Sequence, residues 1–331
     1  MISTIYIEAA VTEHPRAQLI TAKFPKARII ECDSYQEIFN RRQQNFRIQK
    51  EHPALILAHK RGRRLHPIPS GQQLGAEYNY YFSHLLNCPF DCRYCFLQGM
   101  FSSANYVLFV NYEDFIEEIK EVCSKHTEVV HLFSGYDCDS LALEPLSNFA
   151  TYFSPLVSKI DNAMLELRTK STQIRSLLTS APSPNIIVAM SLAPEVIRQD
   201  LEHGVPSLAE RLQALRRLQA HGFNIGLRFD PVIPLSNTTS TYRKFFAQVF
   251  AEIDKSAVHS VTIGGFRLPK AFAKRMTRLY PTEALFAGPH VEFDGSVIFR
   301  GYRGTDTVAI ATAELTRYVS SSKIFLQHMT T

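Results

Sequence analysis

The stretch NCPFDCRYCFLQG, residues 87–99, places three cysteines within eight positions in the spacing C-x3-C-x2-C. The whole chain of 331 residues has only six cysteines, so half of them lie in this one segment. Thiols that recur at such short intervals are typical of a shared metal centre or of redox chemistry, because one loop can bring them together. The segment therefore predicts a metal or redox site built on Cys88, Cys92 and Cys95.

The composition is that of a globular protein with a hydrophobic core, with 45% hydrophobic and 20% charged residues. No apolar run approaches the roughly 18 residues that a membrane-spanning helix needs, and the first residues lack the features of a secretory signal. We therefore expect a cytoplasmic protein with reduced thiols and no membrane association. Disulfides are rare in that compartment, which favours metal or redox chemistry for the cysteine loop.

The net charge of +5 is mildly basic and permits a polyanionic partner. Positive charge is concentrated between residues 41 and 64, where eight basic side chains stand against a single acid, Glu51. The eight are Arg41, Arg42, Arg47, Lys50, Lys60, Arg61, Arg63 and Arg64. Such a cluster is either a surface that contacts phosphates or a solvated segment without a partner.

Residues 1–75 are expected to form a small α/β region of their own. Segment 4–11 alternates like a strand, 34–46 has the pattern of a helix, and 54–60 has the pattern of a short buried strand. The Pro- and Gly-containing segment 66–71 then predicts a linker.

Strand-like and helix-like segments alternate through much of residues 76–331, which predicts parallel strands covered by helices. The clearest helix spans residues 207–221, where Ser207 and Glu210 form an S-x-x-E capping box. About six strand–helix units fit in this region, too few for a complete eight-unit barrel. The fold class we expect is α/β, a partial (β/α)6 barrel followed by a C-terminal hairpin near 291–299 with an Asp-Gly turn.

Three neighbouring cysteines leave the identity of the metal open. Structural zinc usually takes four ligands, and His84 or Cys123 is a candidate for the fourth. A cubane [4Fe–4S] cluster normally takes four thiolates, so three thiolates leave one iron able to bind a substrate or cofactor. The spacing alone does not decide between the two.

With an aromatic residue beside its last cysteine, the motif resembles that of the radical S-adenosylmethionine (SAM) superfamily. Four segments resemble the spore photoproduct lyase family more closely: YIEAAVTEHPRAQLITAKFP (6–25), CRYCFLQG (92–99), DSLALEPL (139–146) and GVPSLAERLQALRRLQAHGFNIGL (204–227). The resemblance implies a radical SAM partial barrel, a [4Fe–4S] cluster, SAM, and an electron donor such as flavodoxin or ferredoxin. It also implies a lyase that cleaves SAM to a 5′-deoxyadenosyl radical and repairs a UV-induced thymine lesion in DNA.

The resemblance assigns roles to individual residues. It implies that Cys88, Cys92 and Cys95 hold the cluster. It implies contacts to SAM for a further set, Tyr94, Ser140, Lys170, Ser191 and Asp230. Several of these also have an ordinary structural interpretation as a packing ring, a solvated lysine, a helix N-cap or a turn-forming aspartate.

The chain departs from the family at the hydrogen-donating residues. The position after the last cluster ligand, often a tyrosine with a role in hydrogen transfer, is Phe96 here. An ungapped alignment places the family's donor cysteine at Tyr136, whereas a shift of two residues makes Cys138 the donor. A shift of two on a strand keeps the same face, so both residues are candidate catalytic groups together with Tyr94.

Three functions follow from these patterns. The leading one is repair of a thymine lesion in DNA by radical SAM chemistry. The second is radical SAM chemistry on another nucleic-acid or nucleotide substrate, which Phe96, Tyr136 and the acidic hairpin at 291–299 favour. The third is a zinc-stabilised, non-catalytic protein that binds nucleic acid, which the basic segment 41–64 fits.

Overall fold

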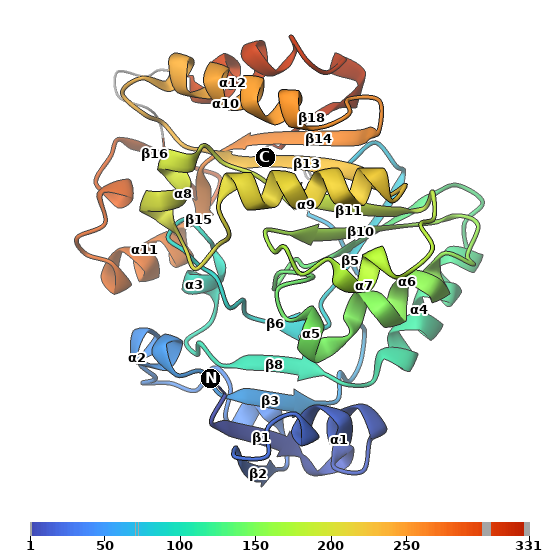
Figure 1. Ribbon diagram of the computed structural model, residues 1–331. Helices are drawn as coiled ribbons and strands as arrows, with labels where there is room; N and C mark the ends of the chain where they lie inside the picture. Colours follow the sequence, from blue (N-terminus) through green and yellow to red (C-terminus); the bar gives the residue numbers. More distant parts are fainter. Residues whose placement is uncertain (1, 70, 72, 300–305, 328–331) are drawn as a thin grey trace.

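The computed structural model of the chain describes residues 2–69, 71, 73–299 and 306–327. Two sheets dominate the fold, a five-stranded sheet near the N-terminus and an eight-stranded sheet made mostly of later residues. Figure 1 shows the smaller sheet below the larger one, with α3 (Leu97–Met100) at a level between them. Among the described residues, no helix has both the length and the apolar character needed to cross a membrane.

The smaller sheet has the strand order β2-β1-β3-β8-β6. β1 (Thr4–Glu8) lies between its parallel partners β2 (Arg28–Cys32) and β3 (Leu55–Ala58). β8 (Tyr106–Phe109) pairs in parallel with β3, and β6 (Leu85–Leu86) pairs antiparallel with β8. The sheet therefore takes strands from both sides of residue 75, and the cysteine loop is the connection between two of its strands, β6 and β8.

Two predicted segments differ from the structure: the linker expected at 66–71 begins with a short strand, β4 (His66–Pro67), and the helix expected at 34–46 is absent. Residues 34–46 do not form a helix: a short 3-10 turn (Tyr35–Glu37) leads into irregular chain, and α2 (Phe46–Glu51) begins only afterwards. Asn40 and Gln43 have backbone φ angles of 62° and 63°. These angles lie in the left-handed region, which interrupts a right-handed helix.

The larger sheet has the strand order β18-β14-β13-β11-β10-β9-β5-β4. Its centre consists of six parallel strands that follow one another in sequence order. They are β5 (Tyr78–Phe82), β9 (Val130–Ser134), β10 (Ala163–Thr169), β11 (Ile186–Ser191), β13 (Asn224–Val232) and β14 (Val258–Gly265). β18 (Ile324–Gln327) adds a parallel strand beside β14, and β4 (His66–Pro67) pairs antiparallel with β5 at the other edge. The predicted half barrel is confirmed.

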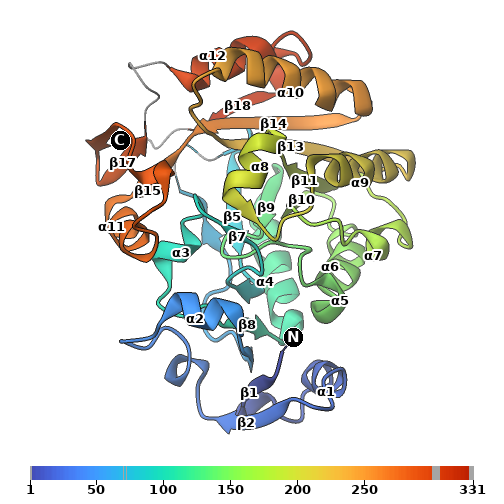
Figure 2. The same ribbon diagram turned by 60° about the vertical axis from the view of Figure 1, so that its left-hand side comes forward.

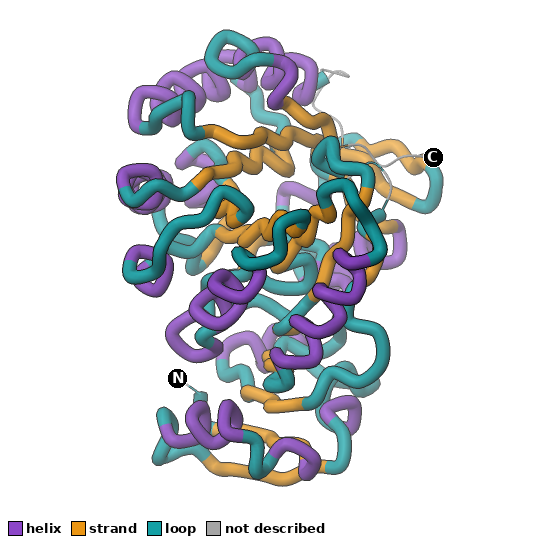
Figure 3. The backbone as a smooth tube through the Cα atoms, turned by 90° about the vertical axis from the view of Figure 1, so that its right-hand side faces the viewer, coloured by secondary structure: helices purple, strands orange, loops and turns teal. Residues whose placement is uncertain are grey.

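Helices cover the outer face of the larger sheet, as Figure 3 shows. The longer ones are α4 (Tyr112–Ser124), α6 (Phe149–Val157), α9 (Leu208–Ala220), α10 (Thr238–Glu252) and α12 (Thr307–Leu315). The predicted capping box is present at the start of α9. There the Ser207 hydroxyl accepts from the Glu210 N–H, and the Glu210 carboxylate accepts from the Ser207 N–H at 2.7 Å.

Side chains alternate along β10 between the two faces of the curled sheet. Leu165 and Leu167 are fully buried in the main hydrophobic core. Glu166 and Arg168 point to the opposite, inner face, so this face of the half barrel carries charged groups.

Two short sheets attach further segments to the half barrel. β7 (Asp91–Cys92), within the cysteine loop, pairs antiparallel with β12 (Glu202–His203). β15 (Arg267–Pro269) pairs with β17 (Ser296–Phe299), which in turn pairs with β16 (His290–Phe293). The predicted C-terminal hairpin and its Asp-Gly turn are confirmed.

Candidate active site

The cysteine loop is fastened to its surroundings by backbone contacts. The β7–β12 pairing holds its middle, and the Arg93 N–H donates to the Leu201 carbonyl at 2.8 Å. Within the loop, the Cys95 N–H donates to the Cys92 carbonyl at 3.0 Å, and the Gln98 side-chain amide donates to the same carbonyl at 2.6 Å. These bonds connect the loop to β12 and α8 (Glu195–Leu201) and link its own residues to one another.

A cavity of about 520 Å³ opens beside this loop, at the carboxyl ends of the barrel strands. Barrel folds place their functional sites at this end. Nine of the residues predicted from the sequence line it: Cys88, Cys92, Tyr94, Cys95, Tyr136, Cys138, Lys170, Ser191 and Asp230. The tenth, Ser140, lies behind Gly135, with its Oγ 2.8 Å from the Ser134 Oγ.

Cys92 is buried and the other two loop cysteines are partly buried, and desolvation raises the pKa of each thiol. Nearby positive charges and a backbone N–H donor lower the thiol pKa values. Lys50 and the Phe90 N–H lower the pKa of Cys88, and Lys170 lowers the pKa of Cys92. The same groups stabilise negative sulfur, which is the form that binds a metal.

The two candidates for a fourth zinc ligand lie elsewhere. The His84 ring stacks on Phe149 with centroids 3.7 Å apart and planes 4° apart, and burial lowers its pKa to about 3. Cys123 is buried on α4, which covers the outer face of the larger sheet. Neither residue lines the cavity, so the structure does not assemble the four-ligand zinc site that the sequence left open.

The three loop cysteines form a donor set that suits an iron–sulfur cluster. In the part of the chain that the structure describes, no group of three or more His, Cys, Asp and Glu side chains is arranged to hold a metal ion. The ligands of a cubane cluster need not surround a single metal ion, because each binds a separate iron atom at a separate corner. Three cysteines on one short loop, all lining one cavity, supply such a set and leave one iron to another donor.

Tyr94 belongs to a buried hydrogen-bond network. Its hydroxyl donates to one Glu202 carboxylate oxygen, and Arg211 donates to the other at 2.9 Å. Arg211 also donates to the Ser191 carbonyl at 2.8 Å. Glu202 and Arg211 are 1% and 0% exposed, so this ion pair is shielded from water. It joins the cysteine loop to the end of β11, which is another wall of the same cavity.

Lys170 follows β10 directly, and its ammonium lies 5.5 Å from the centroid of the Tyr94 ring. Burial acts to lower the pKa of Lys170, but the ionised form of Cys92 and the Glu202 carboxylate outweigh burial and raise it. Its backbone N–H donates to Asp139 Oδ2 at 2.6 Å, and the Thr169 hydroxyl donates to Asp139 Oδ1 at 2.6 Å. Asp139 thus fixes the strand end that presents a charged lysine to the cavity.

The loop after β9 brings Gly135, Tyr136 and Cys138 to the cavity. A prediction is corrected here: β9 ends at Ser134, so Tyr136 and Cys138 lie in a loop and not on one face of a strand. Gly135 has a φ angle of 78°, and a Cβ at this position would lie 2.5 Å from the Ser140 Oγ. Only glycine fits this backbone without strain.

This loop gives the cavity a wall of aromatic rings with one further thiol. The Tyr136 ring stacks on Tyr81 with centroids 4.3 Å apart, and its centroid is 5.7 Å from that of Phe96. Burial raises the pKa of Cys138 well above its usual value, and Cys88 nearby adds to this. Cys138 is therefore a neutral S–H group at neutral pH, the form that can give up a hydrogen atom.

Asp230 on β13 is held by Arg267. The Arg267 guanidinium donates to the two carboxylate oxygens at 3.1 and 3.3 Å and to the Gly265 carbonyl at 2.8 Å. A Cβ at Gly264 would lie 2.9 Å from Asp230 Oδ1, so β14 approaches the carboxylate closely. Asp230 also lines the cavity, and its carboxylate retains acceptor capacity for a ligand hydroxyl.

The sequence model of one protein family, spore photoproduct lyase, matches residues 1–287. The chain belongs to the spore photoproduct lyase family. It is 21% identical over 266 residues to the spore photoproduct lyase of Bacillus subtilis (strain 168), across 78% of this chain and 75% of that protein. A solved spore photoproduct lyase mutant with bound AdoMet and dinucleoside spore photoproduct matches with a TM-score of 0.83 at 17% identity, covering 100% of this chain and 99% of that one. Another, complexed with dinucleoside spore photoproduct, matches with the same coverage and a TM-score of 0.84 at 16% identity.

Membership of the spore photoproduct lyase family confirms the resemblance seen in the sequence. The structural matches confirm the α/β half-barrel fold. The roles of individual side chains stay predictions, and they gain support from the location of nine of these residues around one cavity.

Sequence reasoning missed four residues that shape the site: Asp139, Glu202, Arg211 and Arg267. For one of them the sequence contained a signal. Arg211 lies three residues after Leu208 and four before Leu215, on the leucine stripe of α9, and it is fully buried. A charged residue on the apolar stripe of a helix predicts a buried partner of opposite charge.

Proposed function

We propose that this chain is a radical SAM enzyme that repairs a UV-induced thymine lesion in DNA by breaking a carbon–carbon bond. One observation carries the proposal. A single cavity is lined by the three loop cysteines, by Tyr94, Lys170, Ser191 and Asp230, and by the neutral thiol of Cys138. Membership of the spore photoproduct lyase family agrees with this chemistry.

We assign the [4Fe–4S] cluster to Cys88, Cys92 and Cys95, and SAM to the cavity beside them. When bound, the cluster and SAM supply a 5′-deoxyadenosyl radical that removes a hydrogen atom from the substrate. A cytoplasmic carrier such as flavodoxin or ferredoxin is the electron source that we propose.

The residues around the cavity match the polar groups of SAM. Lys170 keeps its positive charge and suits a carboxylate, whereas Asp230, oriented by its arginine partner, suits the hydroxyls of a ribose. Ser191 adds a hydroxyl on the neighbouring strand end, and Tyr94 contributes a ring beside the lysine. Ser140 supports the glycine loop from behind.

We assign the hydrogen-atom donor to Cys138. Its S–H would transfer a proton and an electron together to the carbon radical that remains on thymine after bond cleavage. The buried position of the thiol, 7% exposed, keeps water away from this step. Tyr136 lines the same cavity with a phenolic O–H and is the second candidate for this transfer.

Repair or conversion of another nucleic-acid or nucleotide substrate is the second candidate function. Phe96 favours it, because a phenyl ring has no O–H to take part in hydrogen transfer. The hairpin also favours it: residues 290–299 include Glu292 and Asp294 but no Lys or Arg. Glu292 accepts a hydrogen bond from Lys270 at 2.5 Å, and this lysine lies outside the hairpin.

The test is a product assay on the anaerobically reconstituted chain with dithionite, SAM and DNA irradiated in the dry state. We expect about four iron atoms per chain, formation of 5′-deoxyadenosine, and thymine recovered from the lesion. Cys138→Ala should lower the yield of thymine per 5′-deoxyadenosine at least about tenfold. Cys32→Ala, a matched change on β2 outside the cavity, should leave this ratio unchanged.

Two outcomes would contradict the proposal in different ways. Bound zinc with no cleavage of SAM would exclude radical SAM chemistry altogether. Cleavage of SAM without recovery of thymine from irradiated DNA would favour the second candidate function.

A further inference from the structure

Two short segments, residues 41–51 and 270–279, together carry a larger positive net charge than the complete chain. Residues 41–51 contain four basic side chains and one acid, and residues 270–279 contain four basic side chains and no acid. Together they carry a net charge of +7, whereas the complete chain carries +5. The rest of the molecule is therefore slightly acidic, and the positive charge is strongly localised.

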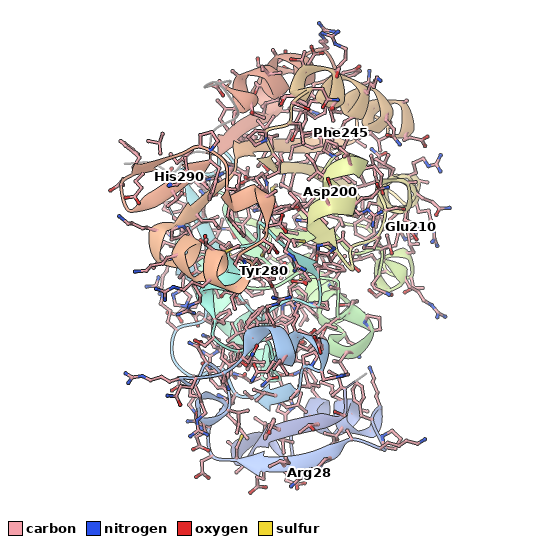
Figure 4. All side chains as sticks on the ribbon, turned by 90° about the vertical axis from the view of Figure 1, so that its left-hand side faces the viewer. Arg28, Asp200, Glu210, Phe245, Tyr280 and His290 are labelled. Carbon is pink, nitrogen blue, oxygen red and sulfur yellow. The ribbon has the colours of Figure 1, made fainter. Side chains whose placement is uncertain are left out.

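The fold places these two segments next to each other. The first contains α2, and the second contains α11 (Lys270–Leu279); Figure 2 shows both helices and α3 along one side of the molecule. Arg47 joins the two helices, because its guanidinium donates to the Leu279 carbonyl at 3.4 Å and lies 5.6 Å from the centroid of the Tyr280 ring. Figure 4, which looks onto this face, shows Tyr280 between α11 and α2.

We call the exposed basic side chains of this face the basic rim: Arg41, Arg42, Arg47, Lys270, Lys274, Arg275 and Arg278. Lys270 is paired with Glu292 at 2.5 Å. Across residues 2–69, 71, 73–299 and 306–327, the other six have no carboxylate within ion-pair distance. No carboxylate of the described residues therefore neutralises their charge.

The basic segment predicted from the sequence is divided by the fold. Arg64 is committed to Asp114 at 2.7 Å and to Glu118 at 3.4 Å, and Arg63 donates to the Leu65 carbonyl at 2.7 Å. The part of this segment near α2 instead joins α11, whose charges the sequence analysis did not connect with it. The continuous basic surface is thus a product of the tertiary structure.

The basic rim borders the cavity of the candidate active site. Phe46 and Lys50 of α2 and Phe272 of α11 all line this cavity, and Phe90 and Phe96 add two more rings to its wall. Basic side chains around an aromatic-lined opening are typical of surfaces that bind a nucleic-acid backbone while unstacked bases contact the rings.

The geometry points to the basic rim as the surface that binds the phosphates of DNA on both sides of the nucleotide in the cavity. This inference rests on the proposed function, since it takes DNA as the substrate. Phosphate contacts fix the register of a protein on DNA without reading its sequence. The basic rim therefore binds undamaged DNA as well, and its contribution is largest at low salt.

An acidic electron carrier is another polyanion that a basic surface can bind. The aromatic lining shared with both helices favours DNA, because a carrier protein has no need of rings that open into the substrate cavity. The test below separates the two partners, because it measures DNA affinity and reduction of the cluster independently.

The experiment uses fluorescence anisotropy with a labelled, undamaged duplex of about 20 base pairs, titrated between about 0.05 and 0.3 M salt. Lys274→Ala/Arg278→Ala removes two charges from α11, and Arg41→Ala/Arg42→Ala removes two beside α2. Each double variant should bind at least about tenfold more weakly at about 0.1 M salt, with the slope of log K against log salt reduced by about 1.8.

The matched control is Arg217→Ala/Lys244→Ala, which removes two exposed charges from α9 and α10 on the outer face of the half barrel. It should bind DNA like the parent chain, and all variants should show the same urea midpoint. Equal losses in the control and rim variants would overturn the inference. Unchanged DNA affinity with slower cluster reduction by flavodoxin would also overturn it and identify the rim as the docking site of the carrier.

DNA affinity is measured here without turnover. A chain that binds DNA through the rim but never cleaves SAM would refute the proposed function and still support the inference. The two conclusions therefore fail separately.

Discussion

Arg211→Met tests the buried ion pair that joins the cysteine loop to the barrel. The substitution removes the charge together with the hydrogen bonds to Glu202 Oε2 (2.9 Å) and to the Ser191 carbonyl (2.8 Å). Glu202, 1% exposed, is then left as a buried carboxylate with the Tyr94 hydroxyl as its partner. We expect the free energy of unfolding to fall by about 3–5 kcal/mol, because an unpaired buried charge costs about that much.

The double variant Arg211→Met/Glu202→Gln separates charge from packing. The side-chain amide that this change introduces at position 202 still accepts from the Tyr94 hydroxyl through its carbonyl oxygen, but it has no charge. Neutral groups of similar volume often replace a buried ion pair at little cost, so most of the lost stability should return. The Ser191 carbonyl still lacks its donor, which leaves a cost of about 1 kcal/mol.

The assay is urea unfolding of the metal-free chain at neutral pH, followed by circular dichroism. Arg217→Met on the exposed side of the same helix is the matched control and should change the free energy of unfolding by less than about 0.5 kcal/mol. A cost below about 1 kcal/mol for Arg211→Met would refute the reasoning. A double variant less stable than the single variant would refute it as well, because removal of both charges would then bring no relief.

Two further predictions concern acid stability and the glycine beside the cavity. Burial lowers the pKa of His84 to about 3, so the ring stays neutral in the folded chain down to about that pH. In the unfolded chain the same ring binds a proton below about pH 6.5. The free energy of unfolding therefore decreases as the pH falls from about 6.5 towards 3. Urea unfolding at about pH 6 and at about pH 5 gives the change in unfolding free energy per pH unit. His84→Phe should make this change smaller by about 1.4 kcal/mol per pH unit. The same pH dependence in the variant and the parent chain would contradict a neutral buried ring. Gly135→Ala should weaken SAM binding and destabilise the chain more than the matched Gly204→Ala, which has a similar φ angle of 75° but no atom within 4 Å of its added Cβ. Equal effects, each about 1–2 kcal/mol from backbone strain alone, would show that the close packing of Gly135 against the Ser140 Oγ has no role.

Local patterns predicted most of the barrel. The capping box at Ser207 fixes the start of α9, and alternating strands and helices force a parallel sheet. Asp294 and Gly295 have φ angles of 44° and 71°, which is the backbone that an Asp-Gly pair favours in a hairpin. These signals are contained in a few neighbouring residues, so they can be found without knowledge of the tertiary structure.

Contacts between distant segments were not predictable in this way. Leu55 of β3 pairs with Tyr106 of β8, about fifty residues later, and this pairing extends the smaller sheet beyond residue 75. No periodicity in either strand shows which edge it joins. The same limit explains why the basic rim was missed, since α2 and α11 meet only in the folded chain.

The metal-binding part of the candidate site was easier to predict from the sequence than the SAM-binding part. The spacing of Cys88, Cys92 and Cys95 predicted a shared centre, because all three lie on one loop. The SAM contacts came from the family resemblance and not from spacing. Lys170, Ser191 and Asp230 lie on or just after three different strands, and their common cavity becomes visible only when those strands are ordered in the sheet.

Charged residues inside apolar patterns predict buried partners of opposite charge. Glu166 stands between two leucines of β10, Arg228 lies within the buried strand β13, and Arg211 lies on the leucine stripe of α9. Burying each charge is costly unless an opposite charge accompanies it, so each position predicts a partner in another apolar segment. The sequence cannot decide whether Glu166 pairs with Arg211 or with Arg228. The order of the strands in the sheet determines the pairing, because β10 and β13 lie on either side of β11. The Arg228 side chain extends across β11 and donates to both Glu166 carboxylate oxygens at 2.6 and 3.0 Å. Arg211 pairs with Glu202 instead.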